Sequence, residues 1–181
     1  MPSYRDKSDI IDLPKIPTHF VELANTLIKD IFTTEESKIN KLEKIYNFLT
    51  IYGNFVQTFS VCSKGCSHCC SIDVQITELE AIYIQEKGHK QLKEYIHNKS
   101  INNYTPCPFL NSDNGECTIY NDRPFNCRTF HTLDDPKYCE TNEEHQLYNT
   151  YTSEYYSKLF DILLQYLNRH QDIYDIRDYF D

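Results

Sequence analysis

Long apolar runs are missing from this 181-residue sequence. No stretch approaches the roughly 18 consecutive apolar residues that a membrane-spanning helix needs. The first residues, MPSYRDKSDIIDLPK, contain neither the basic region nor the apolar segment of a secretory signal. We therefore expect a cytoplasmic protein with no membrane partner.

Apolar residues are scarce in general. Without tyrosine, and with glycine counted, they make up about 34% of the chain, where roughly 45–50% is usual. Leu, Ile, Val and Phe still amount to about 25%, above the roughly 20% below which a charged chain is expected to be disordered. The composition predicts a folded chain with a thin hydrophobic core.

Positive charge and glycine are also in short supply. The chain has 18 Lys and Arg against 27 Asp and Glu, a formal net charge of -9. Because phosphate binding depends mostly on Lys and Arg, this balance disfavours a nucleic-acid partner. Only 4 glycines are present, and none forms a glycine-rich loop of the kind that cradles a nucleotide.

Cysteine, in contrast, is locally abundant. All 8 cysteines lie between Cys62 and Cys139, and in a reducing compartment such a cluster more often indicates metal or redox chemistry than disulfides. The run CSKGCSHCC starts at Cys62. Thiolates spaced in this way on a tight loop can converge on a soft metal centre, zinc or an iron–sulfur cluster. The neighbouring pair Cys69 and Cys70 favours two centres or one polynuclear centre.

A second set of motifs follows: CPFL from Cys107 and CTIYNDRPFNCR from Cys117 to Arg128. With the ending Cys69-Cys70 and the segment TELEA from Thr77, these motifs resemble the CxxCxxCC proteins, also called YkgJ-type, described as zinc- or iron-chelating domains. The resemblance covers about residues 62–130. It implies that seven thiols gather around metal: Cys62, Cys66, Cys69, Cys70, Cys107, Cys117 and Cys127.

Cys139 lies beyond the resemblance. As an eighth ligand it would complete two sets of four thiolates, and a single leftover thiol packed nearby is the alternative. We include Cys139 among the candidate ligands. His68 and His131 could ligate or support a ligand, but for His68 a solvated loop histidine is the simpler interpretation.

Arg123 and Arg128 flank Cys127. Cationic side chains beside thiolates lower thiolate pKa values and donate charge-assisted hydrogen bonds to sulfur. We expect both arginines to act in this way, with an ordinary surface salt bridge as the alternative.

The main functional prediction is a metal-binding protein whose cysteine cluster holds an iron–sulfur cluster, such as a four-iron four-sulfur cluster, or zinc, in a structural or redox role. Its partners are then the metal ion or cluster and, as an open question, a protein partner or substrate. A reversible thiol sensor of oxidation is a further hypothesis. We do not predict catalysis.

Two alternatives come from the loop between Cys62 and Cys66, which is one residue longer than in the family motif. This longer form is similar to the cluster region of bacterial flagellin lysine N-methylases, which implies an S-adenosylmethionine-dependent protein lysine N-methylase-like enzyme as the alternative function. The spacing up to Cys69 is also that of radical S-adenosylmethionine enzymes. Too little chain follows for their barrel, which argues against that class.

The predicted fold is mainly α (α+β with little β), a single small helical domain over residues 1–181 around a cysteine-rich loop region with a short β-hairpin. The metal-binding region 62–139 is flanked by N-terminal helices within 18–53 and by a C-terminal helix over 143–170. Helical spacing of apolar residues supports both flanks. Ser153 is expected to cap or restart the second half of the C-terminal helix.

Local signals place the other boundaries. Capping boxes at Thr33 and Thr77 predict helix starts, and Gly53 and Gly88 predict helix ends. Gly65 is expected to need a positive φ in the cysteine loop. Short strands are expected over residues 55–61 and 73–76, a polar helix over residues 90–97, and the hairpin around the turn 113–115.

Overall fold

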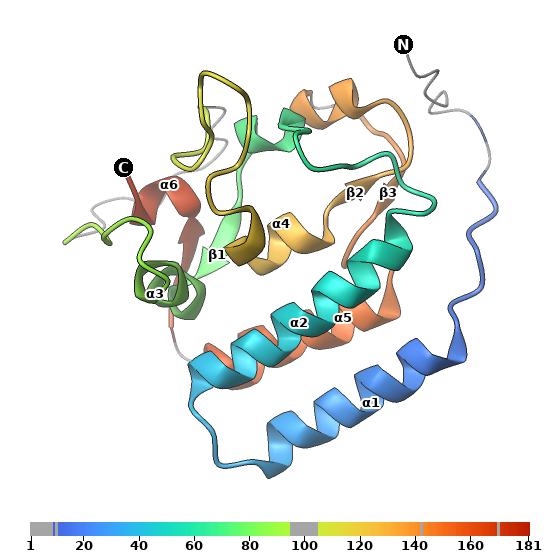
Figure 1. The fold of residues 1–181 in the computed structure, drawn as a ribbon, viewed down its shortest axis with the longest axis vertical. Helices are drawn as coiled ribbons and strands as arrows, with labels where there is room; N and C mark the ends of the chain where they lie inside the picture. Colours follow the sequence, from blue (N-terminus) through green and yellow to red (C-terminus); the bar gives the residue numbers. More distant parts are fainter. Residues whose placement is uncertain (1–8, 10, 95–104, 142, 170) are drawn as a thin grey trace.

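A computed structural model describes most of the chain, and the described residues form a mainly helical structure with little β (Figure 1). The described ranges are 9, 11–94, 105–141, 143–169 and 171–181. This confirms the predicted fold class. Within these ranges no helix is long and apolar enough to cross a membrane.

Three helices lie side by side in one part of the molecule (Figure 1). They are α1 (Thr18–Thr33), α2 (Lys38–Val56) and α5 (Glu154–Asp161). Helix α5 continues into a π-helical segment, Ile162–Leu167, which contacts α2. Helix α2 is therefore the central helix of this group.

The remaining elements lie across α2 from α1, and the cysteine segments run between them (Figure 1). The helices are α3 (Glu78–Glu86), α4 (Phe125–Thr129) and α6 (Ile176–Tyr179). The strands are β1 (Gln75–Thr77), β2 (His131–Thr132), β3 (Leu147–Tyr148) and β4 (Ile173–Asp175). Two antiparallel pairs form, β1 with β4 and β2 with β3. Both pairs join the cysteine region to the C-terminal part of the chain.

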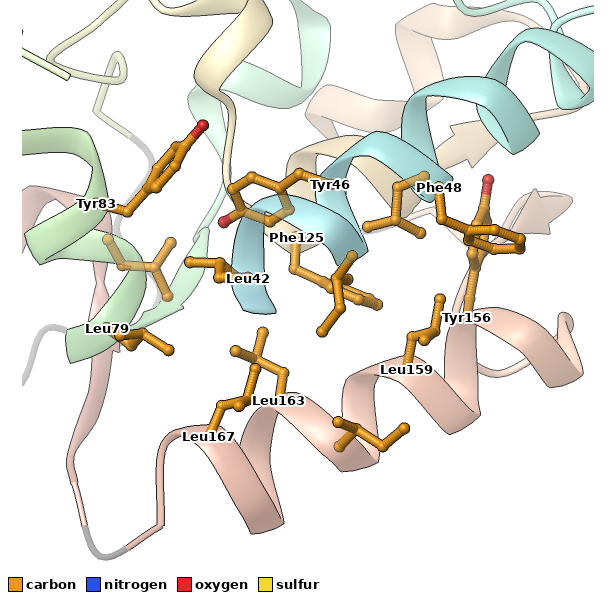
Figure 2. Close-up of a cluster of buried hydrophobic side chains, with 14 of the residues drawn as sticks. Leu42, Tyr46, Phe48, Leu79, Tyr83, Phe125, Tyr156, Leu159, Leu163 and Leu167 are labelled. Atoms are coloured by element: carbon orange, nitrogen blue, oxygen red, sulfur yellow. The ribbon is translucent and has the colours of Figure 1, made fainter. Parts of the chain in front are cut away.

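The core is small and rich in aromatic side chains. Figure 2 shows side chains from α2, α3, α4 and the α5 region meeting in one cluster. The ring of Tyr52 packs at centroid distances of 5.2 Å from Phe20 and 5.3 Å from Tyr156. The hydroxyl of Tyr52 lies 2.6 Å from that of Tyr148, so this buried polar atom is paired. Tyrosines thus supply buried area that aliphatic residues do not.

One buried carboxylate connects three helices. The Oε1 atom of Glu80 accepts hydrogen bonds from the hydroxyl of Tyr46 in α2 at 2.9 Å and from the amide of Phe125 in α4 at 2.6 Å. Its Oε2 atom accepts from the amide and the hydroxyl of Thr77 at 2.8 and 2.9 Å, which confirms the predicted capping box at α3. Glu80 therefore fixes the start of α3 and of α4 together.

The other capping box, predicted at Thr33, is wrong. The hydrogen-bond ladder of α1 continues through this residue, and its hydroxyl bonds to the carbonyl of Lys29 at 2.9 Å. Helix α2 is capped by Ser37 instead, whose side chain accepts from the amide of Asn40 at 3.1 Å.

The predicted helix end at Gly53 is also wrong, and with it the strand over residues 55–61. Helix α2 runs on to Val56. Phe55 packs at centroid distances of 5.3 Å from Phe20 and 5.5 Å from Phe59. Burial of these side chains outweighs the cost of about 1 kcal/mol of a glycine inside a helix.

The C-terminal helix is shorter than the predicted range 143–170. Leu147–Tyr148 pairs with β2 as a strand, and the helix begins only after Ser153, whose side chain accepts from the amide of Tyr156. The predicted cap is confirmed, but strand pairing overrides the helical apolar spacing before it. The π-helical segment ends at Leu167.

Four smaller predictions have mixed outcomes. The strand expected over residues 73–76 is present as β1, and the helix α3 ends before Gly88, which has φ +79°. The hairpin is reduced to one β-bridge between Leu110 and Cys117. The helix over residues 90–97 does not form in its described part, and residues 95–97 lie outside the described residues. The single-domain organisation stays a prediction.

Replacing Glu80 with Gln tests its role as the junction of three helices. The glutamine side chain keeps one acceptor oxygen, but its NH2 group is a donor that would face the buried donors bonded to Glu80. The free energy of unfolding should therefore fall by about 1–3 kcal/mol. Urea denaturation measures this change. Glu86→Gln, at the exposed end of the same helix, should stay within about 0.5 kcal/mol of the unchanged protein. Equal effects of the two substitutions would contradict the role given to Glu80.

Candidate metal centre

The first cysteine segment follows α2 and is folded tightly by its own backbone. Gly65 has φ +94°, the left-handed conformation that favours glycine, as predicted. The amide of Cys70 donates to the carbonyl of Ser67 at 2.8 Å. This bond belongs to a short 3-10 helix, His68–Ser71. The loop therefore turns twice within a few residues.

The second cysteine segment is bonded directly to the first. The amide of Cys107 donates to the carbonyl of Cys70 at 2.8 Å. The β-bridge between Leu110 and Cys117 then brings the next cysteine alongside, across a turn in which Gly115 has φ +72°. Backbone hydrogen bonds thus hold three thiol-bearing residues together.

Cys127 reaches the same place from α4. The first turn of this helix is held by Glu80 through the amide of Phe125, and Pro124 is its N-cap residue. Side chains of six cysteines line one cavity of about 350 Å³. These six are Cys66, Cys69, Cys70, Cys107, Cys117 and Cys127.

We give the name four-thiol group to four of these thiols, which come from the first cysteine loop, the second cysteine segment and α4: Cys70, Cys107, Cys117 and Cys127. A thiolate at Cys70 raises the pKa of each of the other three, after burial, so all four lie within electrostatic reach of one another. The charge of Cys70 also raises the pKa of Cys66, after burial. Burial raises the pKa of Cys107 to about 11 and that of Cys127 well above its usual range. The pKa of Cys70 is raised above all by its hydrogen bond with Cys69. Several of these thiols can ionise together only beside a cation.

Arg123 brings positive charge to the four-thiol group, which agrees with the electrostatic part of the prediction; the predicted hydrogen bond to sulfur stays a prediction. It lines the cavity, and its Nε donates to the carbonyl of Tyr120 at 2.9 Å. Its guanidinium lies 3.7 Å from the centre of the Tyr120 ring, which holds the side chain in place. Its charge opposes the rise in pKa of Cys70, Cys117 and Cys127.

Arg128 does not act on the thiols, and this prediction is wrong. Its Nε donates to the carbonyl of Arg123, its Nη1 to the hydroxyl of Thr50 at 3.1 Å, and its Nη2 to the carbonyl of Asn121. The guanidinium lies 4.3 Å from the centre of the Tyr46 ring. Arg128 follows Cys127 directly in α4, and successive residues of a helix are rotated by about 100°. The side chain of Arg128 therefore points away from that of Cys127, toward α2.

The two remaining cysteines lie outside the cavity lining. The Sγ atom of Cys62 accepts a hydrogen bond from the amide of Thr132 at 3.2 Å. Cys139 is buried, with 4% of its surface exposed. Cys62 and Cys66 are the two thiols whose charge, after burial, raises the pKa of Cys139 to about 12. The structure therefore places Cys139 beside the start of the first segment.

All 8 cysteines are free thiols. Among the described residues, no three Cys, His, Asp or Glu side chains form a group that could already hold a metal ion. The thiols are neighbours around a cavity, and a bound metal would have to draw its ligands closer.

Comparison with known families identifies the family of this chain. A family model named CxxCxxCC, with the description "Putative zinc- or iron-chelating domain", matches residues 61–153. The chain belongs to the CxxCxxCC family. No curated protein and no solved structure matches the chain. The resemblance predicted from sequence is confirmed, and the CxxCxxCC match extends past residue 130 to include Cys139.

The structure adds an ion pair that the sequence did not indicate, from a tail outside the CxxCxxCC match. Arg177 donates through Nη2 to the carbonyl of Cys70 at 2.9 Å and through Nε to the carbonyl of Thr105 at 2.8 Å. Asp175, which is fully buried, holds Arg177 with oxygens 2.9 and 3.1 Å from Nη1. Asp175 also accepts from the amide of Val74 at 2.6 Å. The pair therefore ties both cysteine segments to the C-terminus.

A local signal for this pair exists in the sequence. Asp175 and Asp178 form a capping box at the start of α6, and the spacing of two acidic residues three apart is visible in the tail. That spacing predicts a helix start, but it does not reveal that Arg177 reaches the carbonyl of Cys70.

The histidines of the CxxCxxCC domain have separate roles. The Nδ1 atom of His68 lies 2.6 Å from an oxygen of Glu140, and its side chain is 39% exposed. His131 is buried, with Nε2 3.0 Å from the carbonyl of Arg128 and 3.2 Å from the hydroxyl of Tyr156. Neither contact is with a thiol. Among the described residues, His145 contacts the thiol of Cys139, and this contact was not predicted.

His131 should make stability depend on pH. Burial lowers its pKa from 6.5 to about 4, so the folded protein resists a proton that the unfolded chain accepts. The free energy of unfolding should therefore fall as pH decreases from about 6.5 to about 4, by on the order of 3 kcal/mol. Urea denaturation across this range should show a smaller decrease for His131→Gln. His68→Gln is the control and should keep the full decrease; an unchanged slope in His131→Gln would contradict the assignment.

Removing Arg177 tests the ion pair beneath the cysteine segments. Arg177→Met leaves Asp175 buried without its cation, so the free energy of unfolding should fall by about 3–5 kcal/mol. Adding Asp175→Asn to the same chain should restore part of the loss. Lys158→Met, which removes an exposed ion pair with Glu154, should cost less than about 1 kcal/mol. An equal loss of the free energy of unfolding in the Arg177 and Lys158 variants, measured in urea, would contradict the role given to the ion pair.

Proposed function

We propose that the four-thiol group holds an iron–sulfur cluster, and that this cluster gives the protein a structural or redox role. The observation that carries the proposal is the approach of Cys70, Cys107, Cys117 and Cys127 to one cavity from separate segments. Membership in a family described by zinc or iron chelation supports metal binding in general.

The chemistry of the donors fits such a group. Thiolates are soft ligands that suit iron–sulfur clusters and zinc rather than magnesium or calcium. The cavity beside them measures about 350 Å³, whereas a water molecule takes up about 30 Å³ of liquid volume. There is room for a group of several atoms, which favours a polynuclear cluster over a single ion in this position.

The surroundings also suit a thiolate-rich centre. Four thiolates carry more negative charge than a buried site tolerates alone, and Arg123 places one positive charge at the cavity wall. Arg177 donates to the carbonyl of Cys70, and its charge likewise opposes the rise in the pKa of Cys70 and Cys107. When bound, an iron–sulfur cluster accepts or donates one electron at a time.

The structural role follows from the thin core. A centre ligated by the four-thiol group would cross-link the first cysteine loop, the segment after residue 105 and α4. Metal binding of this kind adds folding free energy that apolar burial does not supply, on the order of 10 kcal/mol for zinc in small domains. Free thiols are best kept in a reducing compartment, which supports the expected cytoplasmic location. The methylase alternative stays a hypothesis.

Anaerobic purification of the full chain tests the cluster. We expect a brown protein that contains iron and acid-labile sulfide, with visible absorbance that bleaches on reduction or exposure to air. Cys127→Ser should lower the iron and sulfide content by more than half, because one ligand of the four-thiol group is lost. Ser63→Ala, in the exposed part of the first cysteine loop, is the control and should keep both. A colourless protein with zinc and no sulfide would replace the iron–sulfur proposal with a zinc site.

A further inference from the structure

His145 faces Cys139, a buried thiol that does not belong to the four-thiol group. Its Nε2 atom lies 3.7 Å from the Sγ atom of Cys139. We propose that Cys62, Cys66, Cys139 and His145 form a second centre that binds one zinc ion, separate from the four-thiol group. This inference takes from the proposed function only the assignment of Cys70, Cys107, Cys117 and Cys127 to the first centre.

Strand pairing brings these residues together from three segments. The amide of Thr132 in β2 donates to the sulfur of Cys62, and the carbonyl of Thr132 accepts from the amide of Val61 at 3.1 Å. On the other edge of β2, the amide of Leu133 donates to the carbonyl of Gln146 at 2.9 Å. Because Gln146 directly follows His145, the segment that carries Cys62 lies along one edge of β2 and the segment that carries His145 along the other.

Cys139 arrives through a contact between two short helices. The 3-10 helix Pro136–Glu140 carries Cys139 and packs against the helix His68–Ser71 in the cysteine loop. In Figure 1 these two helices lie next to each other at the upper edge of the molecule. The contact brings Cys139 to the first cysteine loop, and the charges of Cys62 and Cys66 in that loop raise the pKa of Cys139, after burial.

The spacing of the two facing atoms suits one metal ion. Zinc binds sulfur at about 2.3 Å and imidazole nitrogen at about 2.0–2.1 Å with tetrahedral angles, which places the two ligand atoms about 3.6 Å apart. The observed separation between Cys139 Sγ and His145 Nε2 is 3.7 Å. This pair already has the spacing of two ligands, and Cys62 and Cys66 would complete a Cys3His set by moving inward.

The other nitrogen of the imidazole fixes its orientation. The Nδ1 atom of His145 lies 3.0 Å from the carbonyl oxygen of Glu143. A carbonyl can only accept, so Nδ1 carries the proton, and in the neutral ring Nε2 turns a lone pair toward the sulfur. Histidines that ligate metals usually donate their second ring nitrogen in this way.

The two other histidines described in this region, His68 and His131, do not have the same arrangement. His68 is engaged by the carboxylate of Glu140, and His131 by a carbonyl and a tyrosine hydroxyl. Zinc entry would replace the protons of Cys62, Cys66 and Cys139 and release three protons to solvent. The resulting charge of the centre, one negative unit, is easier to bury than three thiolates without a metal.

The test uses the full chain, expressed with zinc or with cobalt as a spectroscopic substitute, and elemental analysis. We expect one zinc per chain in addition to the iron of the first centre. In His145→Ala the zinc affinity should fall at least about tenfold, as for losses around other zinc sites, while iron and sulfide stay unchanged. The tetrahedral ligand-field bands of the cobalt form should weaken at the same time.

Two further variants keep the result decisive. His145→Cys should keep the zinc and should strengthen the sulfur-to-cobalt charge-transfer band, because a fourth thiolate replaces the imidazole. His68→Ala is the matched control and should behave like the unchanged chain. Full zinc content and an unaltered cobalt spectrum in His145→Ala would overturn the inference, as would loss of iron together with zinc. Zinc bound through His145 in a chain without iron and sulfide would instead overturn only the proposed function.

Discussion

The carbonyl oxygen of Cys70 is the point on which the cysteine region depends. It accepts the amide of Cys107 from the second cysteine segment and the Nη2 atom of Arg177 from the C-terminal tail. One acceptor thereby joins three parts of the chain that are far apart in sequence. Since Asp175 is buried and pairs with Arg177, the junction is protected from water and its polar groups satisfy one another. Thiols that lie on this junction are held close together before any metal binds.

The helical part of the protein connects to this junction through Glu80. Its carboxylate receives a hydroxyl from α2 and an amide from α4, so the helix that carries Cys127 is positioned against the central helix of the core. Arg128 strengthens the same connection from the other face of α4. In a protein with few aliphatic residues, buried polar junctions of this kind and packed tyrosine rings contribute part of the stability that a larger apolar core would supply.

Local signals predicted the structure well where a single turn of chain decides it. The capping box at Thr77, the left-handed Gly65 and the cap at Ser153 are all present. Predictions failed where distant contacts decide: α2 continues through Gly53 because the residues after it pack on α1, and Leu147–Tyr148 pairs with β2 in place of the predicted helix. Periodicity records which residues are apolar, but it does not record which other segment will cover them.

Sequence by itself determined the kind of chemistry and the family, because the identity and close spacing of the cysteines restrict the ligands to soft donors for zinc or iron. The tertiary structure alone decided which thiols share a cavity, that Arg123 faces them while Arg128 faces α2, and that His145 and Arg177 belong to their surroundings. The reason is physical: hydrogen bonds at the carbonyl of Cys70 and at β2 bring together residues as far apart as Cys70 and Arg177, or Cys62 and Thr132. Separation along the chain carries no information about such contacts.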